Sequence, residues 1–447
     1  MAAYQTLKGT SKDMINKDFK GKLFAISVEI PDKSGIKTTV EPGRAHYSYK
    51  SVKDKFCELF DESGQPWIEL KNPEIYRDFN LKETIFSNQN TEKVHISFKP
   101  PQYLRTAGGF KNIAHVAWEF ERIRSKYSLQ PVLPANDDIR MLLAFDQVWV
   151  GCEFTKSVFE RHGLKSVHII PAPIKTPPQN LTSRESNLQL SKLEKIKKEN
   201  ILCWPVSVRN HGFMYAEKSI KRAPVEISNL LRKAHKSRDG KTFLQIVNPH
   251  DRRKNIKKLI KAFHAARHNH PDSILILKLT SPEKGEKVYE ILRWFLDDSH
   301  ALDADGVYFT TDYISEAQKY TFMSLFDFYI SPSRAEGQNL PLQEAMACGL
   351  VPVSTRNTAM LDYINESNAY IIPSSITEIN HLNNPDESMW GFEWFDSSEM
   401  EIFKTILQAL QAPEEELTIK RSAAQKTITE KYSFPAISES ISLALSK

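Results

Sequence analysis

Two glutamates and the start of a helix lie close together in one polar segment of the C-terminal half. Glu336 and Glu344 have seven residues between them in the run Ser331-Pro-Ser-Arg-Ala-Glu-Gly-Gln-Asn-Leu340-Pro-Leu-Gln-Glu-Ala-Met-Ala-Cys-Gly349. A helix start carries free backbone N–H groups and a partial positive charge, which suit a phosphate. A carboxylate accepts paired hydrogen bonds from vicinal hydroxyls, which a ribose or a hexose offers. The residue types therefore indicate a site for a phosphate and for sugar hydroxyls.

A strand, a loop and a helix must position these groups. Residues 326–330 have a strand-like apolar pattern, and a short helix is expected from Leu340, where the following proline suits the first turn, to Gly349. Spacing alone leaves two interpretations about equally good. A loop acid near a helix dipole and an acid on a solvated helix face also give two glutamates this far apart.

Positive residues gather at a second junction between a strand and a helix. The strand expected at residues 242–247 is followed by Arg252, Arg253 and Lys254 and then by an amphipathic helix from Ile256. Cations are poorly placed at a helix start unless something anionic offsets them, and arginine and lysine neutralise a diphosphate. Lys278, at the end of the next expected strand, is a further candidate for contact with phosphate or base.

The segment with the two glutamates resembles the donor-site signature of retaining GT-B glycosyltransferases, specifically glycosyltransferase family 4. That family has the same separation of glutamates, a similar run from Glu344 to Gly349, and a following strand like residues 351–354. The resemblance implies that Glu336 is catalytic, that Glu344 grips ribose hydroxyls and that Lys254 holds the donor's diphosphate. It also implies that phosphate and sugar bind at the backbone amides of Gly337, Gln338, Asn339 and Leu340.

The basic segment, residues 248–255, departs from the family at one point. Many members have a Gly-Arg pair just after the strand, where this chain has Asn248 and Pro249. We expect Arg253 to take over the second phosphate contact.

The N-terminal half has its own candidates. The strand expected to begin at Asn112 runs through His115 and ends in Trp118-Glu119-Phe-Glu121, and acids beside aromatics at the carboxyl edge of a strand are typical of a ligand crevice. The Trp-Glu pair, with a later Asp-x-Val-Trp-Val strand, is similar to a subgroup of the same family. Trp118 and Glu119 are therefore expected on the acceptor side. His115 has two interpretations, a histidine of the core or a catalytic group near the sugar.

Strands alternate with helices through most of the chain, which predicts an α/β fold with parallel sheets. The resemblance implies a GT-B architecture, with two Rossmann-like domains that face each other across a cleft. We expect an acceptor-side domain at 1–175, a polar insertion and linker at 176–240, and a donor domain at 241–415. Helices at 416–447 are expected to cross back to the first domain.

The implied reaction moves a sugar from a nucleotide-diphosphate sugar to a glycan or lipid-linked saccharide acceptor, with the anomeric configuration retained. This is the chemistry of a hexosyltransferase in surface polysaccharide biosynthesis. No metal and no other cofactor are expected, because Arg253, Lys254 and the helix start stabilise the leaving diphosphate. Asp303 and Asp305 spell an Asp-x-Asp, but the glycine that follows favours a turn over a metal site.

Two rival functions remain open. A retaining glycosidase also needs two neighbouring carboxylates, although the basic segment argues against it. A GT-B-like binding or scaffold protein with a degenerate donor site is the second rival, and the missing Gly-Arg pair favours it.

Composition limits the other classes of function. The 447 residues are 40% hydrophobic and 26% charged, with a net charge of +5, which fits a globular protein and is no nucleic-acid signature. The four scattered cysteines favour free thiols over disulfides or zinc. The N-terminus lacks the apolar core of a signal peptide, so we expect a cytoplasmic protein, which leaves room for peripheral contact with a membrane.

Overall fold

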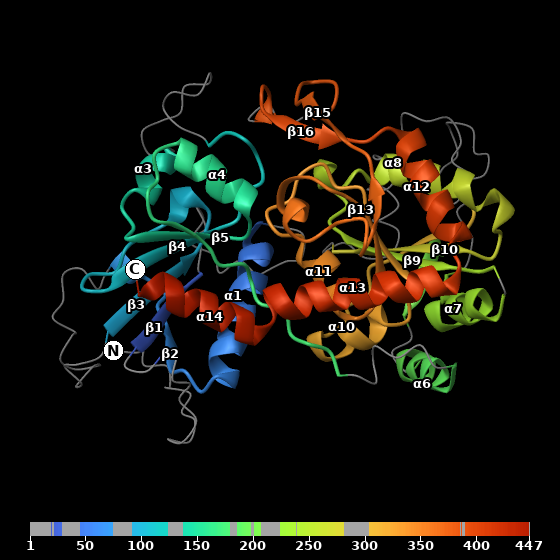
Figure 1. Cartoon of the computed structure of the whole chain (residues 1–447), viewed down its shortest axis with the longest axis horizontal. Helices are drawn as coiled ribbons and strands as arrows, with labels where there is room; N and C mark the ends of the chain where they lie inside the picture. Colours follow the sequence, from blue (N-terminus) through green and yellow to red (C-terminus); the bar gives the residue numbers. More distant parts are fainter. Residues whose placement is uncertain are drawn as a thin grey trace. The chain divides into compact units, whose positions relative to one another are not determined.

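A computed structural model describes residue 19 and residues 22–28, 45–74, 92–123, 137–178, 186–197, 201–206, 224–237, 239–280, 304–384, 386 and 389–446. The chain divides into two compact units. Unit 1 comprises residues 1–174, 379–393 and 431–447, and unit 2 comprises residues 175–378 and 394–430. Each unit is an α/β structure with its own sheet (Figure 1).

Unit 1 is built on a six-stranded sheet in which every pairing is parallel. Its strands, in spatial order, are β2 (Trp67–Glu69), β1 (Lys22–Ser27), β3 (Glu92–Phe98), β4 (Lys111–Val116), β5 (Gln147–Val150) and β6 (Val167–Ile169). Helices α1 (Ala45–Glu62) and α14 (Phe434–Leu445) lie on one face, and α3 (Asp138–Leu142) and α4 (Glu153–Arg161) lie on the other (Figure 1). The short η3 (Pro101–Tyr103) follows β3. Strands covered on both faces are mostly apolar, as in β1.

The last helix of the chain belongs to unit 1. Gln147 Nε2 donates to the carbonyl of Ala444 at 2.7 Å, and Lys111 Nζ donates to the carbonyl of Leu445 at 3.2 Å. The end of α14 is therefore fixed beside the first residues of β4 and β5.

Unit 2 is built on an eight-stranded sheet. Its strands, in spatial order, are β14 (Tyr370–Ile372), β13 (Val351–Thr355), β12 (Phe328–Ser331), β9 (Thr242–Val247), β10 (Ile274–Leu279), β11 (Val307–Thr310), β7 (Leu202–Pro205) and β8 (Val225–Glu226). Helices α8 (Ile256–Ala266) and α12 (Glu399–Gln411) cover one face, and α10 (Glu316–Met323) and α11 (Leu340–Ala347) lie on the opposite face (Figure 1). The largest apolar cluster lies under α8 and α12 and includes Phe243, Phe263 and Ile406.

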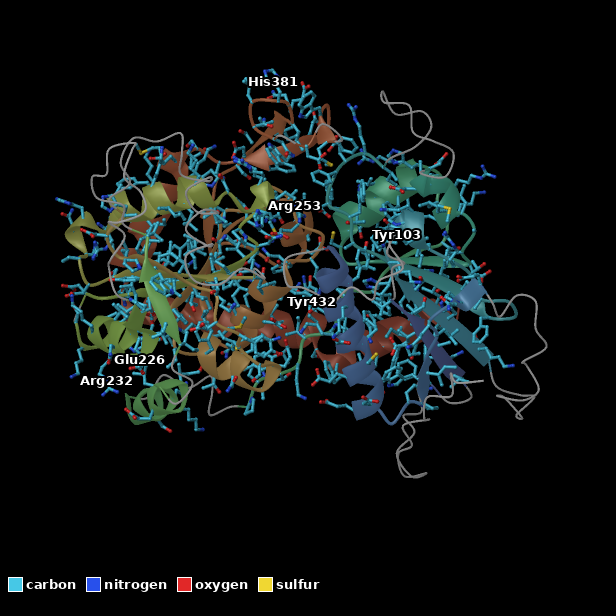
Figure 2. All side chains as sticks on the ribbon, turned by 180° about the vertical axis from the view of Figure 1, so that it is seen from behind. Tyr103, Glu226, Arg232, Arg253, His381 and Tyr432 are labelled. Atoms are coloured by element: carbon cyan, nitrogen blue, oxygen red, sulfur yellow. The ribbon has the colours of Figure 1, made fainter. Side chains whose placement is uncertain are left out.

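The remaining elements of unit 2 surround this sheet. They are α6 (Ser186–Lys197), α7 (Ile227–Lys236), η5 (Arg252–Lys254), η6 (Arg267–Asn269), η7 (Thr358–Asp362) and most of α13 (Glu414–Tyr432). A two-stranded sheet joins β15 (Ser375–Glu378) to β16 (Glu393–Asp396). Glu226 and Arg232 lie at the same end of unit 2, where β8 leads into α7 (Figure 2).

The interval 176–240 differs from the insertion and linker that its polar sequence indicates. Trp204 of β7 pairs antiparallel with Phe309 of β11, and Cys203 pairs with Val225 of β8. Because both strands extend the sheet, this interval contributes to unit 2. The mainly polar composition of the interval concealed β7 and β8, which are two short strands at one end of the sheet.

The parallel strands of unit 2 place their carboxyl ends at one edge of the sheet. Val247, Leu279, Ser331 and Thr355 end β9, β10, β12 and β13. In open α/β sheets this edge is where ligands bind. The basic segment and the segment with the two glutamates both start there.

The cysteines and the Asp-x-Asp segment match their predictions where the structure describes them. All four cysteines are described, and none forms a disulfide. Asp305 lies in a turn before β11 with Gly306 at φ 80°, which confirms the turn, whereas Asp303 lies outside the described residues.

Of the helices that the structure describes, none has both the length and the apolarity needed to cross a membrane.

Candidate functional site

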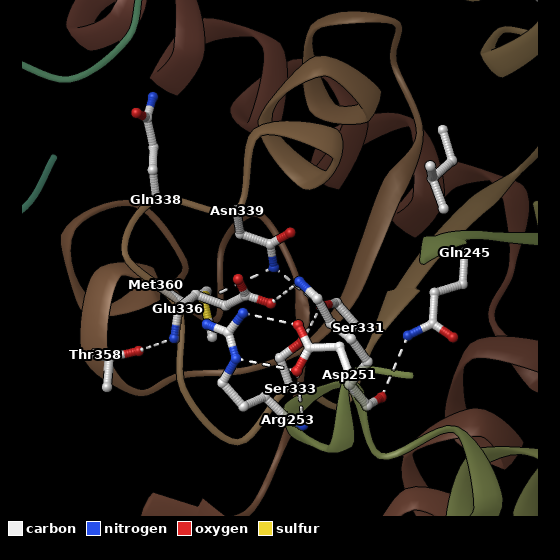
Figure 3. Close-up of polar contacts among 12 residues, drawn as sticks. Gln245, Asp251, Arg253, Ser331, Ser333, Glu336, Gln338, Asn339, Thr358 and Met360 are labelled. Carbon is white, nitrogen blue, oxygen red and sulfur yellow. Dashed lines mark hydrogen bonds and ion pairs between the residues drawn. The ribbon is translucent and has the colours of Figure 1, made fainter. Parts of the chain in front are cut away.

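The loop between β12 and α11 holds the start of the helix in a fixed position. Asn339 precedes α11 with a left-handed backbone, φ 64° and ψ 58°. Asparagine tolerates this conformation better than most residues. Its side-chain amide donates to Ser331 Oγ at 3.0 Å, which closes the loop onto the end of β12 (Figure 3). The amides of Gly337, Gln338 and Leu340 therefore lie at or beside a fixed helix start.

Glu336 lies in this loop and forms an ion pair with Lys254 (Figure 3). The two side chains are 6% and 16% exposed, respectively. The backbone N–H of Glu336 donates to Thr358 Oγ1 at 2.9 Å. The loop and the basic segment thus meet, and they bring together a carboxylate and an ammonium group from distant parts of the sequence.

Thr358 has an unusual backbone. Its φ is 42°, in the left-handed region that β-branched residues rarely adopt. Such strain persists only where the surroundings enforce it, and it concentrates at ligand clamps. Here it presents the threonine hydroxyl to the amide of Glu336.

The basic segment forms the short helix η5, which is capped by Asp251. Arg253 donates to Asp251 through Nε at 3.0 Å and through Nη2 at 2.7 Å (Figure 3). Burial alone would raise the pKa of Asp251, but Arg253 and Lys254 outweigh it and hold that pKa below its usual range. The guanidinium of Arg253, expected to contact phosphate, is thus shared with an internal carboxylate.

Glu344 lies in α11 and pairs with Lys319 of α10. Glu344 Oε1 lies 2.8 Å from Lys319 Nζ, and the glutamate side chain is 5% exposed. Burial raises the pKa of Tyr329 in β12, and the carboxylates of Glu336 and Glu344 raise it further. Each of the two acids of the segment thus has a lysine partner from another part of unit 2.

Lys278 lies one residue before the end of β10, close to the same edge of the sheet. Its Nζ donates to the carbonyl of Leu279 at 2.8 Å. Burial lowers the pKa of Lys278 to about 8, although Asp312 opposes the shift. Near and above pH 8, the amine would therefore gain a proton if an anion bound beside it.

His115, in β4, is the first candidate of unit 1. His115 is 3% exposed, its Nε2 lies 3.0 Å from the carbonyl of Ile170, and its ring contacts Phe56 and Phe98. Burial lowers its pKa to about 4. His115 therefore lies as a neutral histidine in the core of unit 1.

Trp118 and Glu119 lie in the loop after β4. The indole N–H of Trp118 donates to the carbonyl of Arg122 at 2.9 Å, and Thr155 donates to the carbonyl of Trp118 at 2.6 Å. Within unit 1 the same loop meets residues 379–393, because Glu121 Oε1 accepts from the N–H of Glu393 at 3.1 Å. Sequence reasoning did not foresee this neighbour.

Several residues of the site escaped the sequence analysis. Asp251 could have been found, since an aspartate just before a short helix is a common cap. No sequence signal connects Lys319 to Glu344, or Asp396 to Arg334, which it meets at 2.9 Å. These pairs join residues that are distant along the chain, so only the folded structure reveals them.

Part of the chain matches a known protein family. Residues 228–383 match the family described as "Glycosyl transferases group 1". This region contains the basic segment and both glutamates. No protein of curated function matches the sequence.

Solved structures show the class of fold. A mutant of TarM from S. aureus, in complex with fondaparinux, alpha-GlcNAc-glycerol and UDP, is 12% identical, with a TM-score of 0.50 over 82% of this chain and 57% of that one. Anabaena Alr3699/HepE, with UDP and glucose, is 12% identical, with a TM-score of 0.55 over 96% of this chain and 99% of that one. An E. coli structure named for trehalose-6-phosphate, bound with UDP-2-fluoro glucose, is 10% identical, with a TM-score of 0.52 over 94% of this chain and 97% of that one.

The chain thus spans little more than half the length of TarM and nearly all of the other two proteins. Its fold is that of the GT-B class, with two Rossmann-like units, as the sequence predicts. The part that resembles glycosyl transferases of group 1, residues 228–383, lies almost wholly in unit 2.

Proposed function

We propose that the chain is a retaining glycosyltransferase that uses a nucleotide-diphosphate sugar as donor and a glycan or lipid-linked saccharide as acceptor. The observation that carries this proposal is the meeting of Glu336, Lys254 and the start of α11 at the carboxyl edge of the sheet in unit 2. A carboxylate, an ammonium group and the backbone amides of a helix start are what a sugar diphosphate needs. The match of residues 228–383 to glycosyl transferases supports it.

The donor is divided among these groups in the proposed mechanism. Lys254 and the amides of residues 337–340 bind the diphosphate, and Glu344 accepts hydrogen bonds from the ribose. Glu336 orients the sugar hydroxyls and stabilises positive charge at the anomeric carbon as its bond to the phosphate oxygen breaks. The leaving phosphate takes the proton of the attacking acceptor hydroxyl on the same face, so the anomeric configuration is retained.

No metal is required in this scheme, because the lysine and the helix start already offset the charge of the leaving diphosphate. Lys278 is assigned to the base or the distal phosphate, and Arg253 assists Lys254 at the diphosphate. Trp118 and Glu119 are assigned to the acceptor side of the reaction. His115, the second catalytic candidate, is buried in β4 and is assigned a supporting role in that strand, which leads to Trp118 and Glu119.

Donor turnover tests the proposal. The purified protein is incubated with UDP-, GDP-, ADP- and dTDP-sugars, alkyl glycoside acceptors and EDTA, and the released nucleoside diphosphate is measured. We expect release from one nucleotide family, abolished in Lys254→Met and kept in Lys261→Met, a lysine of the helix that follows. Proton NMR of the product should show the anomeric configuration of the donor.

A binding protein with a degenerate donor site is the second candidate, favoured by the internal pairing of Arg253 with Asp251. Nucleotide binding without any release in the same assay would support it. Release that depends on a divalent metal, or a product of inverted configuration, would contradict the mechanism proposed above.

A further inference from the structure

The carboxylate of Glu344 lies inside unit 2 and has a cation of its own. Its side chain is 5% exposed, and its Oε1 lies 2.8 Å from Nζ of Lys319, whose side chain is 15% exposed. Taking a carboxylate out of water is costly unless a cation and hydrogen bonds offset the loss. Lys319 is therefore the group that allows position 344 to carry a negative charge in the interior.

Lys319 reaches Glu344 from a helix whose first turn is firmly held. Ser315 and Gln318 form a capping box at the start of α10, in which the backbone N–H of Ser315 donates to Gln318 Oε1 at 3.2 Å. Lys319 also pairs with Glu316, but the side chain of Glu316 is 78% exposed, so water screens that contact. Of these two pairs, the one with Glu344 is the one that burial strengthens.

The charge of Lys319 does not vary with pH under ordinary conditions. Burial alone would lower its pKa, but the carboxylates of Glu344 and Glu316 outweigh this effect and raise it above the usual value for lysine. A compact ammonium on one oxygen of a carboxylate also restricts rotation of that carboxylate. Its direction is then fixed before any ligand arrives.

We infer that Lys319 is a positioning residue for ribose recognition, which keeps Glu344 ionised and turned toward the vicinal hydroxyls of the nucleotide. This inference rests on the proposed function, because it takes Glu344 as the carboxylate that binds ribose. It assigns a role to a lysine outside the donor-site segment and outside the basic segment. Lys319 itself does not touch the reacting atoms.

Discrimination between ribose and deoxyribose tests the inference. Dissociation constants are measured by calorimetry for UDP, GDP and ADP and for their 2′-deoxy forms. The proteins are the wild type, Lys319→Met, Lys319→Arg and the control Glu316→Gln, which removes the exposed partner only. Melting temperatures show that each variant is folded.

The wild type should prefer one ribonucleotide over its deoxy form about tenfold or more, since a site built for a hydroxyl rejects the analogue that lacks it. In Lys319→Met the preference should fall to about threefold or less. Lys319→Arg should keep most of it, and Glu316→Gln should keep all of it.

Three results would overturn the inference alone. They are a wild type that binds a nucleotide without preferring ribose, a Lys319→Met variant with unchanged affinity for both forms, and a Lys319→Met variant that weakens binding of both forms by the same factor. The last would assign Lys319 a structural role only. A wild type that binds none of the six nucleotides overturns the proposed function, and this inference falls with it.

Discussion

At the scale of single residues, Glu336 and Glu344 each contact a lysine from another part of the chain. Lys254 pairs with Glu336, and Lys319 pairs with Glu344. In the proposed mechanism one ion pair breaks and the other persists. Lys254 leaves Glu336 to bind the diphosphate, whereas Lys319 stays beside Glu344. Binding of the donor would therefore release Glu336 to act on the sugar.

Glu336→Gln separates binding from transfer. We expect the rate of transfer to fall about 10²- to 10³-fold, because charge stabilisation at the anomeric carbon is lost. Affinity for the nucleoside diphosphate should be unchanged or tighter, because Lys254 no longer pairs with a carboxylate. Turnover and calorimetry measure the two effects, with Glu399→Gln in α12 as a matched control. Loss of nucleotide affinity equal to the loss of rate would contradict this assignment.

The lowered pKa of Lys278 predicts that the affinity for a nucleoside diphosphate depends on pH. Burial lowers its pKa to about 8 in the unliganded protein, and a bound anion would raise that pKa. Binding then takes up a proton above pH 8, so affinity for the nucleoside diphosphate should decrease as the pH rises from 7 to 9. Calorimetry across this range measures the change.

Lys278→Gln should bind more weakly at pH 7 and lose this dependence. An unchanged pH profile in the variant would remove Lys278 from the site.

At the scale of elements, a charged network fixes η5 against the loop after β12. Arg334 donates to Asp396 through Nε at 2.9 Å and to the carbonyl of Arg252 through Nη1 at 2.9 Å. The backbone N–H of Arg334 donates to the carbonyl of Arg253 at 2.8 Å. Asp396 also accepts from Lys258 at 2.7 Å. One arginine thus holds the basic segment in register with the segment of the two glutamates.

Arg334→Met should therefore weaken nucleoside diphosphate binding although Arg334 is not assigned to the ligand. We expect about a tenfold loss of affinity, because η5 is no longer held, and a loss of stability of about 1 kcal/mol, because Asp396 is partly exposed and keeps Lys258 as a partner. Arg334→Lys should recover little of this, since an ammonium cannot make the paired contacts of a guanidinium. Calorimetry and chemical denaturation measure both effects. Wild-type affinity in a folded Arg334→Met would exclude the network from positioning η5.

Most strands of both sheets were predictable at this scale, because β1, β9 and β12 are rich in apolar residues and β3 alternates apolar with polar residues. The loop and helix of the segment with the two glutamates were predictable too, from Leu340-Pro and Gly349. Strands β7 and β8 were missed, because the apolar run of β7 has four residues in an otherwise polar interval and β8 has two. The left-handed backbone of Thr358 was also unpredictable, because only tertiary contacts can impose it on a β-branched residue.

At the scale of the whole molecule, unit 1 carries buried histidines in a sheet that is otherwise mostly apolar. His95 Nε2 lies 2.9 Å from Ser27 Oγ, and its Nδ1 lies 2.9 Å from Asn112 Oδ1. Burial lowers the pKa of His95 and of His115 to about 4. Unit 1 therefore folds around two neutral imidazoles.

These histidines should make unit 1 sensitive to acid. Between pH 6.5 and pH 4 the unfolded chain binds more protons than the folded chain, so the free energy of unfolding decreases as the pH falls through this window. We expect a loss of about 2 kcal/mol for each histidine between pH 7 and pH 5. Chemical denaturation, with hydrogen exchange of the amides of β3 and β4, measures it.

His115→Gln should remove about half of that pH dependence, whatever its effect on stability at pH 7. His268→Gln, an exposed control, should leave the dependence unchanged. Equal stability of β3 and β4 at pH 7 and pH 5 would contradict the account of this core.

The central claim, that unit 2 binds a nucleotide-diphosphate donor through Glu344 without a metal, is tested most directly by ligand-induced stabilisation. Melting temperatures are measured with UDP-, GDP-, ADP-, CMP- and dTDP-sugars, with and without EDTA, for the wild type and Glu344→Ala. A ligand that binds only the folded state at 100 times its dissociation constant adds about 2.7 kcal/mol. The account predicts that one nucleotide family raises the melting temperature of the wild type equally with and without EDTA, and that Glu344→Ala loses the response. No shift with any nucleotide, or a shift that EDTA abolishes, would contradict it.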